Sequence, residues 1–450
     1  MAAILPPPGP AGRFILGAIP ALRRDPLGNM TAWAARYGDM VHLPLAAIDG
    51  YLLSHPDLVE EVLVTKNRNF IKPGLLRAAG EVLGNGLLTS EGEFWLRQRR
   101  LMQPAFHRDR IAAYGATMVG YTERMLHGWR DGMTLDIHAA MMHLTLGIVA
   151  KTLFGAEIAD RAGDVEAALD VALQRFVDRM SLLRFLDGLP LPRNRRFKRA
   201  LGILDGIIYD VIERRRESGE DTGDLLSMLL DARDDDGARM TDIQLRDEVI
   251  TLFLAGHETT AISLSWTFYL LAQYPEVERR LLEELRDVLG GAEPSVADMP
   301  RLRYTEMVMR ESMRLYPPAW RVGREATVAC EVGGYPIAPG SQLIMSQWVI
   351  HRDPRFFDDP LRFSPERWEG DLVKRLPRYA YFPFGGGARR CIGDTFAMME
   401  GTLILAAVAQ RYSLSLLPGP PVELWPSITL RPRHGIRMSV ARRHRGAGSG

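Results

Sequence analysis

The longest apolar pattern in the chain runs from Asp242 to Gln273, where hydrophobic residues recur at helical spacing until the Tyr274-Pro275 step. At about 1.5 Å per residue, a helix over this range extends about 48 Å, enough to cross a whole domain. Shorter amphipathic patterns predict further helices over residues 94–102, 136–154, 199–218, 224–231, 275–289 and 304–315.

Short alternating segments occur in two parts of the chain. The segments MVHLPL and GYLLSHP, within residues 40–56, predict two strands joined by a turn over 47–50. Pro56 then opens a helix, as proline does at a first helical position. Between residues 325 and 345, short pieces broken by glycines predict a small sheet. The predicted fold class is mainly α with a minor β part.

The composition is that of a globular protein. The 450 residues are 46% hydrophobic and 25% charged, so a sizeable core can be buried. Lys plus Arg is 56 and Asp plus Glu is 55, and this balance argues against a nucleic-acid-binding protein. The most apolar N-terminal piece, 13–22, contains Pro20 and is too short to span a membrane. We expect no membrane span, no secretory signal and, with only two cysteines, a cytoplasmic protein.

One of those cysteines, Cys391, lies in the unusual stretch FPFGGGARRCIGDTFAMME, residues 382–400. Its glycines allow a tight turn, and the helical spacing that follows places Cys391 near a helix N-terminus, where the dipole favours an anion. With Arg389 and Arg390 beside it, the thiol is expected to favour its thiolate form. A thiolate nucleophile needs a nearby base and zinc needs several ligands, whereas haem iron needs one thiolate. The alternative is an inert, buried structural cysteine.

Five residues of this stretch carry a resemblance. Phe384, Gly387, Arg389, Cys391 and Gly393 fit the pattern F-x-x-G-x-R-x-C-x-G, so the chain resembles the cytochrome P-450 monooxygenases, in which this loop holds haem. The resemblance implies haem b (iron protoporphyrin IX), Cys391 as the iron ligand, and Phe384 and Gly393 as cofactor-binding positions.

The resemblance spans nearly the whole chain and implies one large, triangular haem-thiolate monooxygenase domain. We place this domain at 26–441, after an extended lead-in over 1–25 and before a frayed tail over 442–450. The proline-rich start and the PERW and ITLRP segments resemble the branch of microsomal and fatty-acid enzymes, here as a soluble bacterial-type member.

The long predicted helix carries the segment AGHETT, residues 255–260. The small residues Ala255 and Gly256 indicate either close helix packing or a groove for a small ligand. The segment matches the family pattern Ala/Gly-Gly-x-Asp/Glu-Thr, which makes Glu258 and Thr259 the catalytic candidates. Dioxygen activation consumes two protons in a dry pocket, and an acid beside an alcohol can relay them.

Charged residues elsewhere match further positions of the family pattern. Glu311 and Arg314 lie on one face of a predicted helix, and the resemblance implies that they join Arg367 of PERW in a structural network. Burying the two haem propionates requires cations. The resemblance implies that Arg99, Arg324 and Arg389 supply them, and that the neutral side chain of Trp95 also reaches a propionate. Isolated arginines are more often surface charges, and Arg321 competes with Arg324 for this role.

Candidates for substrate contact rest on analogy alone. They are apolar residues that could equally be ordinary core, namely Leu75, Leu76, Leu252, Ala255, Ala319, Val322 and Ile428. An apolar pocket favours a terpenoid or a fatty-acid-like substrate of secondary metabolism, without choosing between them.

The resemblance also implies partners. The chain carries no fused flavin reductase, so we expect a separate electron donor, a ferredoxin with its reductase or a flavodoxin. Arg97, Arg100 and Arg390 are candidates for a basic docking patch. The basic cluster LPRNRRFKRA, residues 191–200, is placed in a connection between helices, as a solvated loop or as a peripheral membrane contact.

The predicted function is insertion of one oxygen atom of O2 into a C–H bond of a hydrophobic small molecule. The alternatives are a haem-thiolate peroxygenase or isomerase and a non-catalytic haem-based sensor. The intact Glu258–Thr259 pair argues against both, because neither needs a proton relay.

Overall fold

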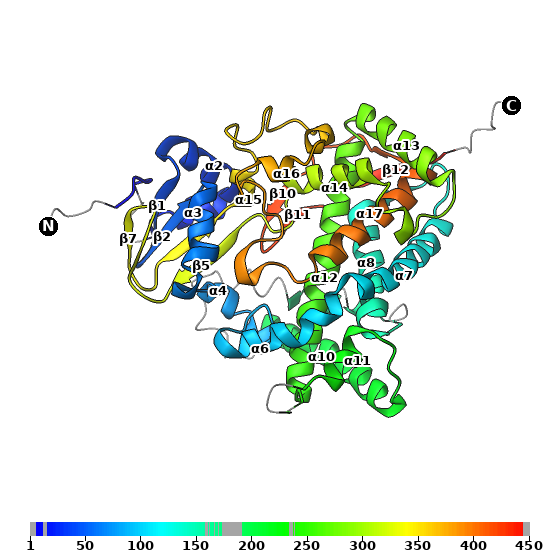
Figure 1. Cartoon of the computed structure of the whole chain (residues 1–450), viewed down its shortest axis with the longest axis horizontal. Coiled ribbons are helices and arrows are strands. Elements are labelled where there is room, and N and C mark those ends of the chain that lie inside the picture. Colours follow the sequence, from blue (N-terminus) through cyan, green and yellow to red (C-terminus); the bar gives the residue numbers. More distant parts are fainter. Residues whose placement is uncertain are drawn as a thin grey trace. The chain divides into compact units, whose positions relative to one another are not determined.

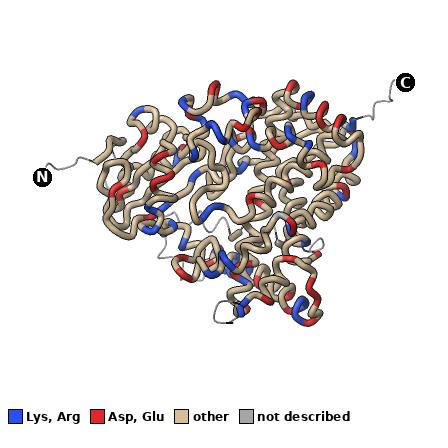
Figure 2. Tube along the Cα trace, viewed as in Figure 1, with Lys and Arg blue, Asp and Glu red and all other residues tan. Residues whose placement is uncertain are grey.

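The structure, a computed structural model, describes residues 6–11, 16–157, 161, 163–165, 167–169, 171–172, 191–233, 237 and 239–443 (Figure 1). Two compact units form. Unit 1 comprises residues 1–74, 307–391 and 423–433, and unit 2 comprises 75–306, 392–422 and 434–450. Basic and acidic residues are interspersed along the described trace of both units, in keeping with the net charge of +1 (Figure 2). Most of the tail predicted over 442–450 lies outside the described residues.

Unit 1 is built on a five-stranded sheet of order β1-β2-β8-β5-β3. Only the β2–β8 pair is parallel. The strands are β1 (Met40–Leu45), β2 (Ile48–Leu53), β8 (Gln342–Met345), β5 (Val322–Ala326) and β3 (Phe70–Ile71). Two small hairpins complete the unit's strands, β6 (Cys330–Val332) with β7 (Tyr335–Ile337) and β10 (Leu424–Pro426) with β11 (Leu430–Pro432).

The turn between β1 and β2 lies earlier in the chain than predicted. Leu45 pairs with Ile48, so the β1–β2 turn is Ala46-Ala47 rather than 47–50, and Ala46 adopts a positive φ of 56°. A two-residue turn of this hand matches the twist of the paired strands, and that requirement outweighs the preference for glycine. The lead-in predicted over 1–25 is also wrong at its end, because Ile19–Arg24 is helical.

The helices of unit 1 are mostly short. They are α1 (Ile19–Arg24), α2 (Pro26–Tyr37), α3 (Pro56–Glu60), the π-helix η2 (Glu61–Thr65), α15 (Gln347–Ile350), the 3-10 helices η3 (Asn67–Asn69), η8 (Pro365–Trp368) and η9 (Gly387–Arg389), and α16 (Leu372–Arg375). The division between units falls within α4 (Gly74–Arg77) and α14 (Arg303–Leu315). Apolar residues of the sheet pack with Leu63, Ile350 and Phe382 in one buried cluster, which ties the loop after Phe382 to the sheet.

Unit 2 holds the long α-helices of the described chain together with two short ones, α5 (Gly80–Leu83) and α11 (Leu225–Asp231). The others are α6 (Gly92–Met102), α7 (Arg108–His127), α8 (Ile137–Phe154), α10 (Pro192–Ser218), α12 (Asp242–Leu271), α13 (Pro275–Leu289) and α17 (Asp394–Arg411). A three-stranded sheet of order β4 (Thr134–Asp136), β12 (Arg437–Arg442) and β9 (Tyr412–Leu416) accompanies them.

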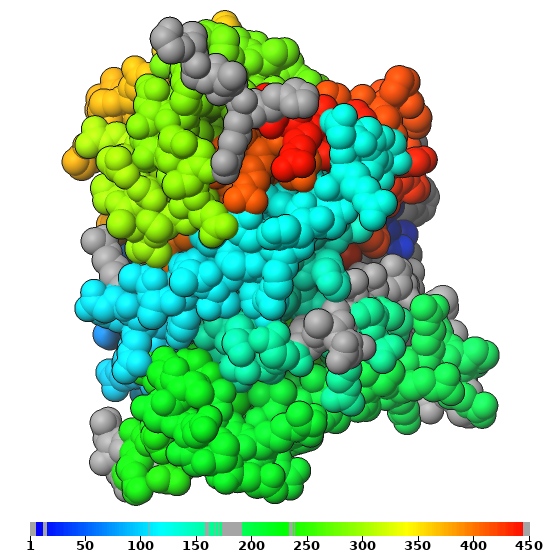
Figure 3. All heavy atoms as spheres, turned by 90° about the vertical axis from the view of Figure 1, so that its right-hand side faces the viewer, coloured from blue at the N-terminus to red at the C-terminus, as the bar shows by residue number. Residues whose placement is uncertain are grey.

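The predicted long helix is α12, and it forms the core of unit 2. The Thr241 side chain and Gln244 form a capping box at its start, and the Pro275 that opens α13 follows soon after its end. Most side chains of α12 are buried, including the fully buried Trp266, because α8, α10 and α17 pack around it. Helix α10, in green, lies at the surface of unit 2 (Figure 3).

Helix α8 is long and apolar enough to cross a membrane by length and composition, the one such helix among the described residues. However, 61% of it is buried within the protein, and its main packing partner is α12. This packing is typical of a core helix, and the length criterion alone is weak evidence for a span.

The basic cluster over 191–200 is helical, so its placement in a connection is wrong. Pro192 occupies the first turn of α10, and Asn194, Phe197 and Ala200 are buried at helical spacing. The predicted start at Arg199 missed this part because charged residues occupy most positions between the buried ones. The surface considered for a peripheral membrane contact is therefore an exposed helix face.

Helix α17 carries an acid in the core of unit 2. Glu400 has no exposed surface and belongs to a helix that packs against α7 and α12. Burial raises the pKa of Glu400 from 4.5 to about 8, and the Thr260 hydroxyl on α12 opposes the shift only in part. Glu400 is therefore neutral at pH 7.

Replacing this acid is expected to change how stability depends on pH. The folded protein holds the Glu400 proton up to about pH 8, whereas the unfolded chain releases it near 4.5. The free energy of unfolding of the wild type should therefore fall relative to Glu400→Gln between these values, by up to about 1.4 kcal/mol per pH unit. Urea unfolding at a series of pH values measures this difference. Glu217→Gln, at an exposed position of α10, is the matched control and should follow the wild type. A pH-independent difference for Glu400→Gln would contradict the burial argument.

Candidate functional site

The cysteine loop, residues 382–391 of unit 1, is closed by its own backbone. The Gly385 N–H donates to the Phe382 carbonyl oxygen at 2.9 Å, and the Cys391 N–H donates to that of Phe384 at 3.0 Å. Gly387 has a φ of 65°, and a Cβ there would collide with the Leu63 carbonyl oxygen. Only glycine satisfies both constraints, so the close approach to η2 explains this position of the motif.

Cys391 ends the loop and is exposed. Gly393 is the N-cap residue of α17, which places the thiol near a helix N-terminus as the spacing predicted. The exposure removes the alternative of a buried structural cysteine. The second cysteine, Cys330, is half-buried in strand β6, and burial raises the pKa of its thiol.

Two of the predicted propionate ligands lie on neighbouring parts of unit 1. Arg389 Nη1 donates to the Phe70 carbonyl oxygen at 3.1 Å. Phe70 belongs to β3, which pairs with the strand β5 that carries Arg324. Arg324 is buried, with 8% of its surface exposed. Its competitor Arg321 instead stacks its guanidinium on the Trp320 ring at 4.6 Å, which favours Arg324 for the propionate role.

The other two predicted propionate ligands lie on helix α6 of unit 2. Trp95 is buried and Arg99 is half-buried, and their i, i+4 spacing puts them on one helix face. Of the residues considered for electron-donor docking, Arg100 on the same helix is exposed, Arg97 is half-buried, and Arg390 of the cysteine loop is exposed.

Helix α12 has one open face within its buried length. Ala255 is exposed and Thr259 half-buried, whereas Phe253 and His257 are buried. The Thr259 hydroxyl donates to the Ala255 carbonyl oxygen at 2.7 Å, and Glu258 is buried with 3% exposed. The open face therefore exposes the Thr259 hydroxyl and the backbone at Ala255, where the small alanine side chain leaves space next to the helix.

Both explanations offered for the small residues of AGHETT apply, each to a different residue. A Cβ on Gly256 would lie 3.0 Å from a methyl carbon of Val149 on α8, so glycine permits close helix packing. The Thr145 hydroxyl of α8 reinforces this contact by donating to the His257 carbonyl oxygen at 2.8 Å. Ala255, by contrast, is on the open face.

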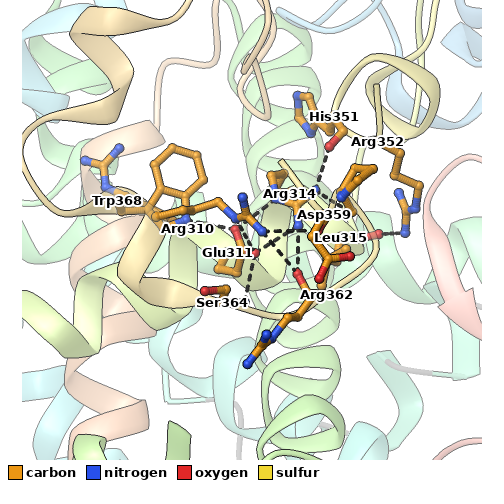
Figure 4. Close-up of polar contacts among 12 residues, drawn as sticks. Arg310, Glu311, Arg314, Leu315, His351, Arg352, Asp359, Arg362, Ser364 and Trp368 are labelled. Atoms are coloured by element: carbon orange, nitrogen blue, oxygen red, sulfur yellow. Dashed lines mark hydrogen bonds and ion pairs between the residues drawn. The ribbon is translucent and has the colours of Figure 1, made fainter. Parts of the chain in front are cut away.

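The predicted structural network is a buried ion pair in unit 1. Arg314 donates to both carboxylate oxygens of Glu311, each at 2.9 Å, and neither side chain has exposed surface (Figure 4). Arg367 Nε adds a third cation–carboxylate bond at 2.8 Å, and the Trp368 Nε1–H donates at 2.9 Å. Ser364 donates its backbone N–H to the same carboxylate at 3.0 Å. The charge of Glu311 is thereby surrounded by donors.

The predicted substrate contacts divide between the units. In unit 1, the Pro318 carbonyl oxygen accepts a hydrogen bond from the Leu430 N–H at 2.9 Å. The Trp320 Nε1–H donates to the Ser427 carbonyl oxygen at 3.1 Å. These bonds bring the segment around Ala319, followed by Val322, to the turn that carries Ile428. In unit 2, three of the candidates differ in burial: the α4 residues Leu75 and Leu76 are half-buried, whereas Leu252 on α12 is buried with 6% exposed. The burial of Leu252 favours its reading as ordinary core.

Two buried residues near these elements were missed. Glu400 is the single acid in an otherwise apolar stretch of α17, and that contrast is a signal the sequence contains. His351 is fully buried and accepts the Phe382 N–H at the start of the cysteine loop at 3.0 Å. No local pattern marks His351, because its partner is distant in the chain.

The side chains at hand fit haem b. One exposed thiol ends a rigid loop, and buried or half-buried arginines can pair with the haem carboxylates. In unit 2, helix α12 presents the Thr259 alcohol on its open face and keeps the neighbouring acid, Glu258, buried. A zinc centre lacks support, because the described part of the chain contains no group of three or more His, Cys, Asp or Glu placed to hold a metal.

Comparison with known proteins agrees with this arrangement. The family model "Cytochrome P450" matches residues 7–437, a single match that includes parts of both compact units. In Streptomyces melanosporofaciens, cyclooctat-9-en-7-ol 5-monooxygenase is 41% identical over 90% of this chain and 88% of its own length. Cyclooctatin synthase of the same organism is 40% identical over 94% and 92% of the two chains. Pentalenene oxygenase of Streptomyces avermitilis is 36% identical over 90% and 92%.

A solved structure is similar over the whole fold. The crystal structure of the cytochrome P450DA heme domain matches with a TM-score of 0.89 and 26% identity, covering 98% of both chains. The mainly helical fold with a minor β part, the haem cofactor and the monooxygenase class are thereby confirmed. The chain belongs to the cytochrome P450 family and is a haem b-dependent monooxygenase.

Proposed function

We propose that this P450 hydroxylates a terpenoid in secondary metabolism, with Cys391 as the thiolate ligand of the haem iron. The exposed Cys391 thiol at the end of the closed glycine loop carries the ligand assignment. The relatives named for cyclooctat-9-en-7-ol and pentalenene favour a terpenoid over a fatty acid. We further propose a cytoplasmic enzyme that receives electrons from a separate ferredoxin or flavodoxin.

In this proposal the chain's own residues bind the cofactor and handle protons. Haem, when bound, supplies the activation of dioxygen for attack on a C–H bond. Trp95, Arg99, Arg324 and Arg389 would hold the propionates. Thr259 on the open face of α12 and the buried Glu258 next to it would deliver protons, and the burial of Glu258 limits the access of bulk water to the acid. The apolar residues Ala319, Val322 and Ile428 would contact the substrate.

Replacing the proposed ligand should remove the thiolate signature. Cys391→Ser is expected to abolish the red-shifted carbon monoxide band of the reduced protein, because a hydroxyl does not supply a thiolate donor. Cys330→Ser removes the other cysteine and is the matched control, in which the band should remain. The absorption spectrum of each reduced, carbon monoxide-treated protein measures this. A surviving band in Cys391→Ser would refute the ligand assignment.

Removing the hydroxyl on the open face should separate electron use from product formation. In Thr259→Ala, product formation should fall on the order of 100-fold while electrons are still consumed and appear as hydrogen peroxide. The assay supplies electrons through a ferredoxin with its reductase, or through a flavodoxin. If the wild-type enzyme turns over with neither of these donors, the proposed electron donor is wrong. Thr267→Ala is the matched control, because Thr267 makes the same bond to the carbonyl four residues earlier, at 2.7 Å, but is fully buried. Tight coupling in Thr259→Ala would remove this residue from the mechanism.

The substrate class is tested by binding. Cyclic terpenoid hydrocarbons and alcohols should give a saturable low-to-high spin shift of the Soret band of the ferric protein. A parallel panel of medium-to-long fatty acids should give none. Shifts with fatty acids alone would move the enzyme to lipid hydroxylation, and no shift with either panel would overturn both substrate classes.

A further inference from the structure

The first residue of the cysteine loop, Phe382, is held at both its backbone N–H and its carbonyl oxygen by α15 and the residue after it. The Phe382 N–H donates to His351 Nε2 at 3.0 Å. The Phe382 carbonyl oxygen accepts from Gln347 Nε2 at 3.5 Å, in addition to the bond from the Gly385 N–H within the loop. His351 and Gln347 have no exposed surface and stand one helical turn apart, so they form a rigid support for the loop.

The bond to Phe382 determines the protonation state of His351. A backbone N–H can only donate, so Nε2 must be the unprotonated nitrogen of a neutral imidazole. Burial, together with the positive charges of Arg314 and Arg352, lowers the pKa of His351 well below 6.5. The ring is therefore an acceptor throughout the neutral pH range. Its plane is nearly perpendicular to the Phe382 ring, at a centroid distance of 5.4 Å, and this contact holds the imidazole in place.

The backbone of the same histidine is tied to the buried ion pair. Arg314 Nη1 donates to the His351 carbonyl oxygen at 2.7 Å (Figure 4). The remaining hydrogen bonds of the guanidinium go to Glu311 and to the carbonyl oxygens of Pro360 and Arg362. Because every donor of Arg314 is engaged, the guanidinium is fixed in orientation, and the position of His351 is fixed with it.

Two backbone hydrogen bonds within the loop connect Phe382 with the backbone of Cys391. Phe382 and Gly385 form the first turn of the loop, and the Phe384 carbonyl oxygen then accepts the Cys391 N–H at 3.0 Å. Displacement of Phe382 would therefore move both ends of the loop together. The apolar cluster around Phe382 resists sliding but does not set the direction of a peptide N–H. Fixing the direction of the Phe382 N–H requires a hydrogen-bond acceptor.

We propose that His351 is a positioning residue that couples the buried Glu311–Arg314 pair to the cysteine loop and so orients Cys391 for thiolate ligation. The proposal rests on the assignment of Cys391 as the haem ligand. It assigns His351 a role beyond core filling, since an apolar residue of similar size would fill the same space without accepting the Phe382 N–H.

Two substitutions separate the acceptor from the volume. His351→Leu removes the acceptor, whereas His351→Gln places an amide oxygen at about the reach of Nε2 and should rescue it. Tyr381→Phe is the matched control, because the Tyr381 ring lies 5.1 Å from His351 but its hydroxyl donates to the Arg310 carbonyl oxygen instead. All three variants alter the same packed region.

Amide hydrogen exchange of the haem-bound proteins, followed by mass spectrometry on the peptide that spans 378–391, is the first measurement. His351→Leu should exchange about tenfold faster there, corresponding to about 1.4 kcal/mol of lost local stability. His351→Gln and Tyr381→Phe should remain close to the wild type. Unchanged protection in His351→Leu, or equal loss in all three variants, would overturn the proposal, because the loop would then not depend on this acceptor.

The second measurement is the fraction of bound haem that shows the red-shifted carbon monoxide band. This fraction should fall in His351→Leu, recover in His351→Gln and stay unchanged in Tyr381→Phe. A full thiolate band in His351→Leu despite fast exchange would show that the loop is not what orients Cys391, and would overturn the positioning role. If the exchange pattern holds but Cys391→Ser keeps its band, the ligand assignment fails while the contact between His351 and the loop stands.

Discussion

The bidentate ion pair between Glu311 and Arg314 is the interaction on which unit 1 depends. A buried carboxylate and a buried guanidinium each cost several kcal/mol to dehydrate, and they are tolerated only when their remaining hydrogen-bonding positions are filled. Ser364, Arg367 and Trp368 fill those of Glu311, and backbone carbonyl oxygens fill those of Arg314. The pair therefore organises segments distant in sequence around a single point of charge.

The cysteine loop is held in place by contacts with several of these segments of unit 1. The sheet strand β3 supplies the carbonyl that holds Arg389, and helix η2 excludes any side chain at Gly387. His351, the residue after α15, accepts the Phe382 N–H. Each contact comes from a different part of the chain. A loop rich in glycine would be mobile by itself, and these contacts compensate for the entropy lost when it is ordered.

Helix α12 of unit 2 has two roles, because it packs in the core of the unit and also carries the predicted catalytic residues. Close packing of Gly256 on α8 allows the helix to be buried on most sides. Only the stretch around Ala255 and Thr259 is left open, and the acid next to it stays buried. The neutral Glu400 on α17 is a further buried acid of this unit, so the interior of unit 2 holds more ionisable groups than its apolar composition suggests.

The sequence by itself determined the periodicities and the motifs. Helix α12, the helix after Cys391 and the pairing of Glu311 with Arg314 follow from helical spacing and side-chain reach, which are local properties. The tertiary structure alone decided the two-residue turn at Ala46, the helical start of α10, the open position of Ala255 and the role of His351. These features depend on which distant groups come together, and hydrogen bonds and burial between such groups leave no periodic trace in the chain.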